Sequence, residues 1–144
     1  MDSFGGKNLL DVDSKPQFAE VAILRAFEQA GWQGRWVETY GKPRMQPGLW
    51  REWMPGGQGA QEQVPISDAW VNERLEAIAV SNGNSFAGCW DVIAWKGDRL
   101  IFAEAKLSKK DRIRGTPLCW LEAALQCGCS VNDFLVVEWS LSPR

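Results

Sequence analysis

The stretch of residues 87–107 constrains the fold of this chain more than any other segment. It predicts two strands joined by a two-residue turn at Gly97-Asp98, where a leading glycine suits a type II′ hairpin. In that register Lys96 faces Arg99, and apolar residues fall on both faces of the pair. One face carries Ile93, Trp95, Leu100 and Phe102, and the other carries Val92, Ala94, Ile101, Ala103 and Ala105. A hairpin with two apolar faces has to lie inside a sheet that is covered on both sides.

The same register places two carboxylates directly opposite each other at the open end of the hairpin. Asp91 faces Glu104, with their Cβ atoms about 5 Å apart. Like charges in that position repel, and burying them among apolar residues is costly. Lys106 lies on the same face, two residues beyond Glu104, and supplies one compensating cation. A divalent metal ion would supply another.

The pattern therefore predicts a metal site built from hard oxygen ligands. Asp91, Glu104 and the backbone carbonyl of Ala105 would coordinate Mg²⁺. Glu20, from the first predicted helix, would add a third carboxylate. Lys106 would orient or deprotonate an attacking water, or neutralise charge that develops on a phosphate. The plainer interpretation is that Glu104 and Lys106 are ordinary charged residues near a strand end and that the helix dipole favours Glu20.

The chain contains no histidine, and this absence narrows the chemistry further. It excludes Ser-His-Asp and Cys-His nucleophile pairs and every zinc site that needs histidine ligands. The remaining inventory of carboxylates, lysine, tyrosine and cysteine favours a magnesium-type site over zinc. The cysteines lack a C-x-x-C pair, so we expect them to be reduced and to act as small buried apolar residues. They are Cys89, Cys119, Cys127 and Cys129.

The rest of the chain, residues 1–144, predicts a single mixed α/β domain around this hairpin. Residues 1–13 read as a loose arm, and Ser14 caps a helix that carries Pro16 in its first turn and runs to about residue 30. The further expected elements are a strand within 32–40, an insertion at 41–85 with a Gly- and Pro-rich loop (41–65) and a helix (69–80, capped by Ser67-Asp68), a helix at 116–126 stopped by Gly128, and a buried strand at 134–141.

At this point the residues resemble a known group. Asp91, followed after twelve residues by Glu104-Ala105-Lys106, resembles the signature of the PD-(D/E)XK nuclease superfamily. The continuation Lys110-Asp111-Arg112-Ile113 and then Trp120-Leu121 is similar to the VRR-NUC branch. The resemblance covers about residues 86–141 and the first helix. Pro117 stands where that branch has glutamine, and Trp90 stands where the superfamily name implies proline.

The resemblance implies a restriction-endonuclease-like core, in which helices flank a central mixed β-sheet in the order αβββαβ, here with an inserted loop and helix. It also implies a catalytic set of Glu20, Asp91, Glu104 and Lys106 around Mg²⁺ or Mn²⁺. The expected activity is that of a deoxyribonuclease, an endonuclease that hydrolyses DNA phosphodiester bonds by direct attack of an activated water, with structure-specific cleavage as one form of it. Because the chain carries one such site, a homodimer would be needed to cut both strands of a duplex.

Two further sets of residues bear on partners. Lys109, Lys110, Arg112 and Arg114 form a local basic patch beside the predicted site, in a chain whose net charge is only −2. We expect this patch to contact the phosphates of DNA, and a solvated loop is the plainer interpretation. Trp50 and Trp53 either stack on unpaired bases, or line a dimer interface, or anchor their loop to the domain. With no N-terminal signal and no membrane-spanning apolar run, we expect a cytoplasmic protein without a membrane partner.

Two rival functions stay open. The first is a catalytically inactive module of the same fold that binds nucleic acid or a protein partner, and the replacement of the branch's glutamine by Pro117 favours it. The second is a protein-interaction domain that uses the loop with Trp50 and Trp53. Cleavage of DNA with Mg²⁺ or Mn²⁺ separates both from the nuclease hypothesis.

Overall fold

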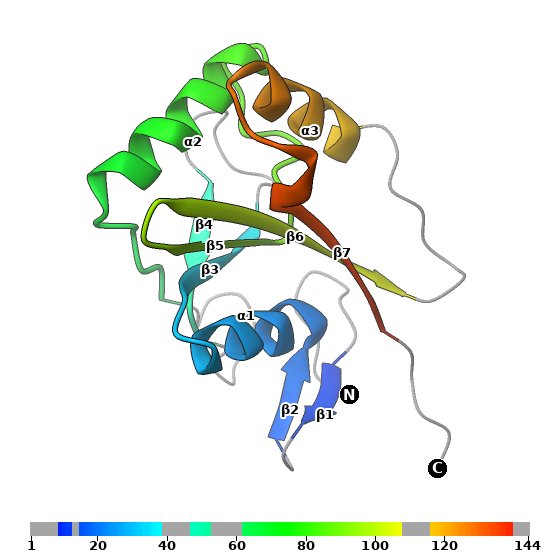
Figure 1. The fold of residues 1–144 in the computed structure, drawn as a ribbon. Helices are drawn as coiled ribbons and strands as arrows, with labels where there is room; N and C mark the ends of the chain where they lie inside the picture. Colours follow the sequence, from blue (N-terminus) through cyan, green and yellow to red (C-terminus); the bar gives the residue numbers. More distant parts are fainter. Residues whose placement is uncertain (1–8, 13–14, 39–46, 53–61, 108–115, 140–144) are drawn as a thin grey trace.

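The structure, a computed structural model, describes residues 9–12, 15–38, 47–52, 62–107 and 116–139. Within these ranges the chain is an α/β fold with a five-stranded mixed sheet flanked by helices (Figure 1). The strands lie in the order β4-β3-β5-β6-β7, and β6 and β7 are the parallel pair. Their bounds are β3 (Gln33–Glu38), β4 (Gly48–Trp50), β5 (Val92–Lys96), β6 (Arg99–Leu107) and β7 (Phe134–Trp139).

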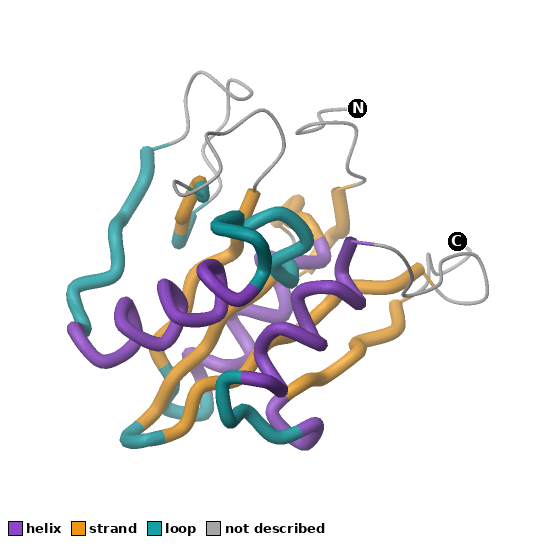
Figure 2. Tube along the Cα trace, turned by 90° about the horizontal axis from the view of Figure 1, so that it is seen from above, coloured by secondary structure: helices purple, strands orange, loops and turns teal. Residues whose placement is uncertain are grey.

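Helices cover both faces of this sheet. α1 (Ala19–Gln29) packs against one face, and β1 (Leu9–Val12) and β2 (Lys15–Phe18) form a separate two-stranded sheet next to it. α2 (Ala69–Ser81) and α3 (Thr116–Gln126) lie side by side over the opposite face, as the view from above shows (Figure 2). The central strands β5 and β6 are therefore covered on both sides, as their two apolar faces predict.

The β5–β6 hairpin has the predicted register. Lys96 faces Arg99 at the turn, and Val92 faces Ala103 at the other end of the ladder. Gly97 has a φ of +59°, whereas Asp98 does not adopt the left-handed conformation, and this combination is the type II′ pattern. Because β5 also pairs with β3, and β6 with β7, both strands of the hairpin lie in the interior of the sheet.

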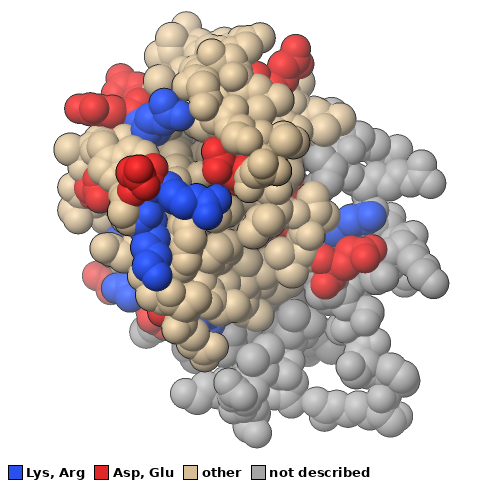
Figure 3. All heavy atoms as spheres, in the orientation of Figure 1, with Lys and Arg blue, Asp and Glu red and all other residues tan. Residues whose placement is uncertain are grey.

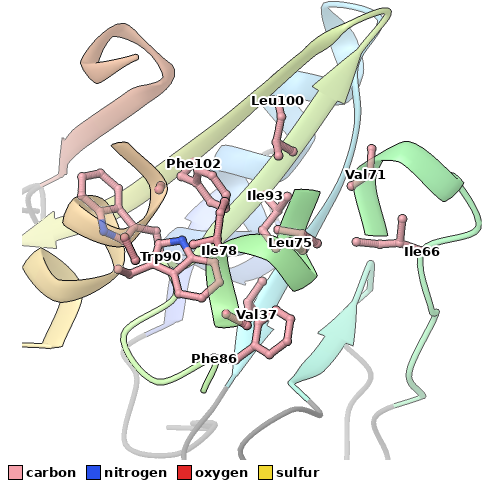
Figure 4. Close-up of a cluster of buried hydrophobic side chains, with 14 of the residues drawn as sticks. Val37, Ile66, Val71, Leu75, Ile78, Phe86, Trp90, Ile93, Leu100 and Phe102 are labelled. Atoms are coloured by element: carbon pink, nitrogen blue, oxygen red, sulfur yellow. The ribbon is translucent and has the colours of Figure 1, made fainter. Parts of the chain in front are cut away.

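Each face of the sheet carries its own hydrophobic cluster. Under α2 and α3, Trp120 is fully buried against Phe86 and Phe102. Figure 4 shows how the side chains of this larger cluster, from the sheet and from the helices, point toward one another. Under α1, the rings of Trp36 and Trp50 stack with their centroids 4.9 Å apart. The predicted core positions of Trp90, Trp95 and Trp120 are confirmed, while the side chain of Trp139 is outside the described residues.

The helices α2 and α3 begin and end close to the predicted positions. The side chain of Asp68 accepts a hydrogen bond from the backbone N–H of Trp70 at 3.2 Å and so caps α2 as expected. α3 begins at Thr116, and Gly128, with a φ of +93°, follows its last turn. In both helices, local capping signals agree with the burial of an apolar face, so the boundaries can be read from the sequence.

The segment before α1 is a strand where the sequence predicts a helix. α1 begins at Ala19, whereas Lys15–Phe18 is β2, paired antiparallel with β1. The capping pattern around Pro16 favours a helix locally, but Leu9–Val12 provides a partner strand. Proline is tolerated there because both strands of a two-stranded sheet are edge strands. The predicted loose arm is therefore wrong for residues 9–12, and residues 1–8 are outside the described part of the chain.

The insertion contains a strand that the composition of its loop conceals. β4, which lies within the segment predicted as a loop, pairs with residues 36–38 of β3. Trp50, only 4% exposed, stacks on Trp36, and Gly48 leaves room for the Trp50 ring because a Cβ atom there would overlap it. Of the three predicted roles of Trp50, the structure supports anchoring of the insertion to the domain. Trp53 is outside the described residues.

Two predicted strands also need correction. β5 begins at Val92 rather than at residue 87, because Gly88 has a φ of +80° and the N–H of Cys89 bonds back to the carbonyl of Phe86, which makes a turn. β7 is not fully buried as predicted, since it lies at the edge of the sheet. Leu135 and Val136 of this strand are 41% and 48% exposed. A run of apolar residues does not reveal whether a strand lies at the edge.

Candidate functional site

Asp91 and Glu104 come together where β5 begins and β6 nears its end. The backbone N–H of Asp91 donates a hydrogen bond to Oε1 of Glu104 at 3.0 Å. In return, Oδ2 of Asp91 accepts a hydrogen bond from the backbone N–H of Ala105 at 2.8 Å. Each half-buried carboxylate is thus held by the backbone of the neighbouring strand, and the predicted opposition of the two side chains is observed.

Asp91 also ends the ladder between β5 and β6. Its backbone carbonyl accepts a hydrogen bond from the N–H of Val37 at 2.8 Å, so Asp91 still pairs with β3. On the side of β6, the carboxylate of Asp91 accepts the hydrogen bond from the N–H of Ala105. If β5 began earlier, a backbone carbonyl of that strand would accept this bond instead. The N–H and C=O of one strand residue point to the same side, so the carbonyl of Ala105 also faces the β5 side. Two carboxylates and one carbonyl therefore belong to this end of the hairpin.

Lys106 extends the site along β6. It lies two residues beyond Glu104, on the same face of the sheet, and is half-buried. Its Nζ atom is 3.8 Å from Oε1 of Glu138, the residue that β7 places beside it in the parallel register. Glu138 could not be identified from the sequence, because nothing local in the sequence sets the register between β6 and a strand that follows a helix.

Glu20 lies in the first turn of α1, where it is buried, with 7% of its surface exposed. Its helix packs against β5 and β6, on the face of the sheet opposite to α2 and α3. Within the ranges that the structure describes, no group of three or more carboxylate or thiol side chains is close enough to hold a metal ion. The structure thus brings two of the three predicted carboxylates together, and the part of Glu20 in the site stays a prediction.

Cys89 is a neighbour of the site for which the sequence predicts only a packing role. Burial raises the pKa of its thiol well above the ordinary value, and the carboxylates of Glu104 and Asp91 raise it further. The thiol therefore stays neutral beside two acidic groups. All four cysteines are free, as expected, but Cys119 is exposed on α3, which corrects its predicted burial, and the others are partly buried.

The raised pKa of Cys89 predicts a pH dependence of stability. Above about pH 8.5 the unfolded chain loses this proton while the folded protein keeps it, so the free energy of unfolding falls as the pH rises. One such group contributes a slope of up to about 1.4 kcal/mol per pH unit. Denaturant unfolding between pH 7 and pH 10 should therefore show a shallower decline for Cys89→Ala than for the wild type. Cys119→Ala, which removes an exposed thiol, is the matched control and should follow the wild type; equal slopes for Cys89→Ala would contradict the prediction.

The segment before Asp91 is tied to α3 by a hydrogen bond between Trp90 and Pro117. The indole N–H of Trp90 donates a hydrogen bond to the carbonyl of Pro117 at 3.0 Å. The Trp90 ring is buried and meets Phe134 edge to face, with 5.0 Å between the centroids. Trp90 therefore couples the start of β5 to the first turn of α3 and to β7, and so helps to fix the position of Asp91.

The predicted basic patch of Lys109, Lys110, Arg112 and Arg114 is outside the described residues. In the part of the chain that is described, basic side chains on the face seen in Figure 3 gather over the end of the sheet that carries the β5–β6 turn, among acidic ones. That end is opposite to the end with Asp91 and Glu104. In this view, the described surface next to the site therefore carries no cluster made up of basic side chains alone.

None of the helices described is long and apolar enough to cross a membrane.

The arrangement of Asp91, Glu104 and Lys106 has to be interpreted from its own chemistry. Comparisons of the chain with protein-family models, with curated proteins and with solved structures found no match.

Proposed function

We propose that the protein is a metal-dependent nuclease that hydrolyses DNA phosphodiester bonds on a restriction-endonuclease-like core. The observation that carries the proposal is the pair of reciprocal hydrogen bonds between the Asp91 and Glu104 segments, with Lys106 on the same strand. The order α1, β3, β5, β6, α3, β7 supports an αβββαβ core, with β4 and α2 inserted between β3 and β5.

The donor set at the end of the hairpin fits a hard divalent cation. Asp91 and Glu104 supply carboxylate oxygens, and each carboxylate has about four acceptor sites, so its hydrogen bond to a backbone N–H leaves capacity for a metal ion. The carbonyl of Ala105 adds a neutral oxygen. When bound, Mg²⁺ or Mn²⁺ supplies Lewis-acid chemistry, which makes a water more acidic and stabilises charge on a phosphate.

The residues of the site then have different roles. Asp91 and Glu104 hold the cation, and their backbone hydrogen bonds keep both carboxylates in place without side-chain rearrangement. Lys106 lies on the same face of β6 two residues beyond Glu104, and its ammonium group would orient the attacking water or neutralise charge that develops on the phosphate. Its ion pair with Glu138 is long, at 3.8 Å, and the Glu138 side chain is 57% exposed, so little is lost when Nζ turns toward a substrate.

Cleavage assays test the proposal with a matched pair of lysine variants. We expect the wild type to cut DNA with Mg²⁺ or Mn²⁺ and to stop when the metal is chelated. Lys106→Ala should lower the cleavage rate by about a hundredfold or more, the usual contribution of a positioned proton-transfer group. Lys96→Ala is the control, because Lys96 is exposed at the other end of the same hairpin.

The same assay distinguishes the rival function. Wild-type protein that binds DNA but cuts none of several forms, single-stranded, duplex and branched, with either metal would favour the inactive binding module. Equal cleavage by the wild type and by Lys106→Ala would remove the catalytic role of Lys106.

A further inference from the structure

A cavity of about 470 Å³ opens at the outer edge of β3, away from Asp91 and Glu104. It is lined by Glu28, Trp32, Gln33, Gly34, Arg35 and Arg51. β4 pairs only with residues 36–38, so it does not cover the first half of β3. Since the N–H of Val37 faces β5, alternation along the strand directs the backbone of Gly34 to the uncovered edge. We call this cavity the Arg35 pocket.

The side chain that defines the Arg35 pocket is a buried cation. Arg35 is only 7% exposed, yet among the described residues its guanidinium donates hydrogen bonds to backbone carbonyls alone, those of Gly34, Val64 and Pro65, at 2.6, 2.7 and 3.4 Å. It also lies over the ring of Trp95, 5.5 Å from the centroid. Among the residues that the structure describes, no carboxylate forms an ion pair with it. A buried charge is normally paired, so this one calls for a counter-ion.

Neighbouring charges do not supply that counter-ion. Glu28 lines the pocket, but Arg25 binds its Oε1, and Nη2 of Arg51 lies 3.2 Å from its Oε2. Nη2 of Arg25 also pairs with Glu52 at 2.8 Å. Three guanidinium groups therefore share two carboxylates, and the excess positive charge is that of Arg35. Burial and the nearby Arg51 lower the pKa of Arg35, while Glu28 raises it, which agrees with an incompletely compensated cation.

We propose that the Arg35 pocket binds a phosphate group, with the guanidinium groups of Arg35 and Arg51 as its cationic contacts. A guanidinium carries five N–H donors in a planar fork that matches phosphate oxygens, and three contacts to carbonyls leave further donors on Arg35. Charge-assisted bonds of this kind are the strong ones in proteins. The phosphate belongs either to a small molecule such as a nucleotide or to the backbone of a nucleic acid. Phosphate binding in this pocket does not depend on the proposed nuclease activity.

Calorimetric titration of the full chain with inorganic phosphate, adenosine monophosphate and adenosine tests the pocket. We expect phosphate and the nucleotide to bind and adenosine not to bind. Arg51→Gln should weaken phosphate binding by tenfold or more without affecting folding, because Arg51 is exposed. Arg35→Met should abolish binding, and thermal unfolding of the ligand-free variant is measured beside it, because the carbonyls of Gly34, Val64 and Pro65 lose their donor. Arg99→Gln, at an exposed arginine outside the pocket, is the control and should bind like the wild type.

The outcomes separate the sources of the phosphate and can overturn the proposal. Tighter binding of the nucleotide than of inorganic phosphate identifies a nucleotide site, and competition by an oligonucleotide that carries only internal phosphates identifies a nucleic-acid contact. Absence of binding by both phosphate and the nucleotide at millimolar concentration, or equal binding by Arg51→Gln and the wild type, overturns it. Loss of DNA cleavage would not overturn the proposal, because each of these readouts is a binding measurement.

Discussion

Asp91→Asn is expected to lower metal-dependent DNA cleavage by at least about a thousandfold and to leave the fold intact. Loss of a supporting outer-shell partner already costs about 10–100-fold in metal affinity or activity, and a direct ligand should cost more. The amide keeps an oxygen that can accept the hydrogen bond from the N–H of Ala105, observed at 2.8 Å. The variant therefore loses the charge that holds the cation, while the end of the β5–β6 ladder keeps its hydrogen bond.

The matched control for this variant is Asp98→Asn. Asp98 undergoes the same chemical change but lies exposed in the turn at the opposite end of the hairpin. Single-turnover cleavage with Mn²⁺, together with thermal unfolding of each variant, separates loss of chemistry from loss of fold. Cleavage by Asp91→Asn within tenfold of the wild type would show that Asp91 is not a metal ligand. A fall in melting temperature that matches the fall in activity would point to a structural role instead.

The position of the candidate site could be predicted because it depends on a short-range rule. A two-residue turn that begins with Gly97 fixes the register of the whole hairpin, so Asp91 and Glu104 meet although twelve residues separate them. The structure adds how they meet. Each carboxylate binds a backbone N–H, a detail that depends on where β5 begins, and β5 begins only at Val92 because the turn at Gly88 precedes it.

The parts that could not be predicted depend on contacts between distant segments. Glu138 reaches Lys106 only through the parallel pairing of β6 with β7, and Trp50 becomes a core residue only because Trp36 offers a ring to stack on. At the start of α1, two local preferences compete. The capping signals around Pro16 favour a helix, and a partner strand at Leu9–Val12 outweighs them. Local propensity is a weak guide wherever a tertiary partner changes the outcome.

Arg35 illustrates the same limit in another way. It lies within the strand expected at 32–40, and nothing in that expectation distinguishes it from its neighbours. Its burial results from the segment before α2, whose carbonyls at Val64 and Pro65 accept its hydrogen bonds. The pocket and the carboxylate pair therefore differ in origin, one from a non-local contact and the other from a hairpin, and they lie on different strands of the sheet.

Trp120→Ala is expected to destabilise the fold more than any of the other substitutions proposed above. Trp120 is fully buried, stacks on Phe86 with 5.5 Å between centroids, and meets Phe102 edge to face at 5.9 Å. Removing a buried tryptophan costs about 3–5 kcal/mol, because the apolar contacts are lost and a cavity remains. For a domain of this size the melting temperature should fall by roughly 10–20 °C. Because α3 packs against β6 through this ring, loss of the ring should also weaken the packing of α3. The hydrogen bond from Trp90 connects that helix to the segment that carries Asp91.

Two further variants show whether the ring or its polar group matters. The indole N–H of Trp120 is buried with no acceptor among the described residues, so Trp120→Phe removes an unsatisfied donor while it keeps an aromatic contact. We expect it to cost less than half as much as Trp120→Ala. Leu125→Ala, at a position 41% exposed on the same helix, should cost about 1 kcal/mol or less. Equal losses for Trp120→Ala and Leu125→Ala in urea unfolding would show that α3 does not depend on the aromatic cluster, and Asp91 would then have to be held by β3 and β6 alone.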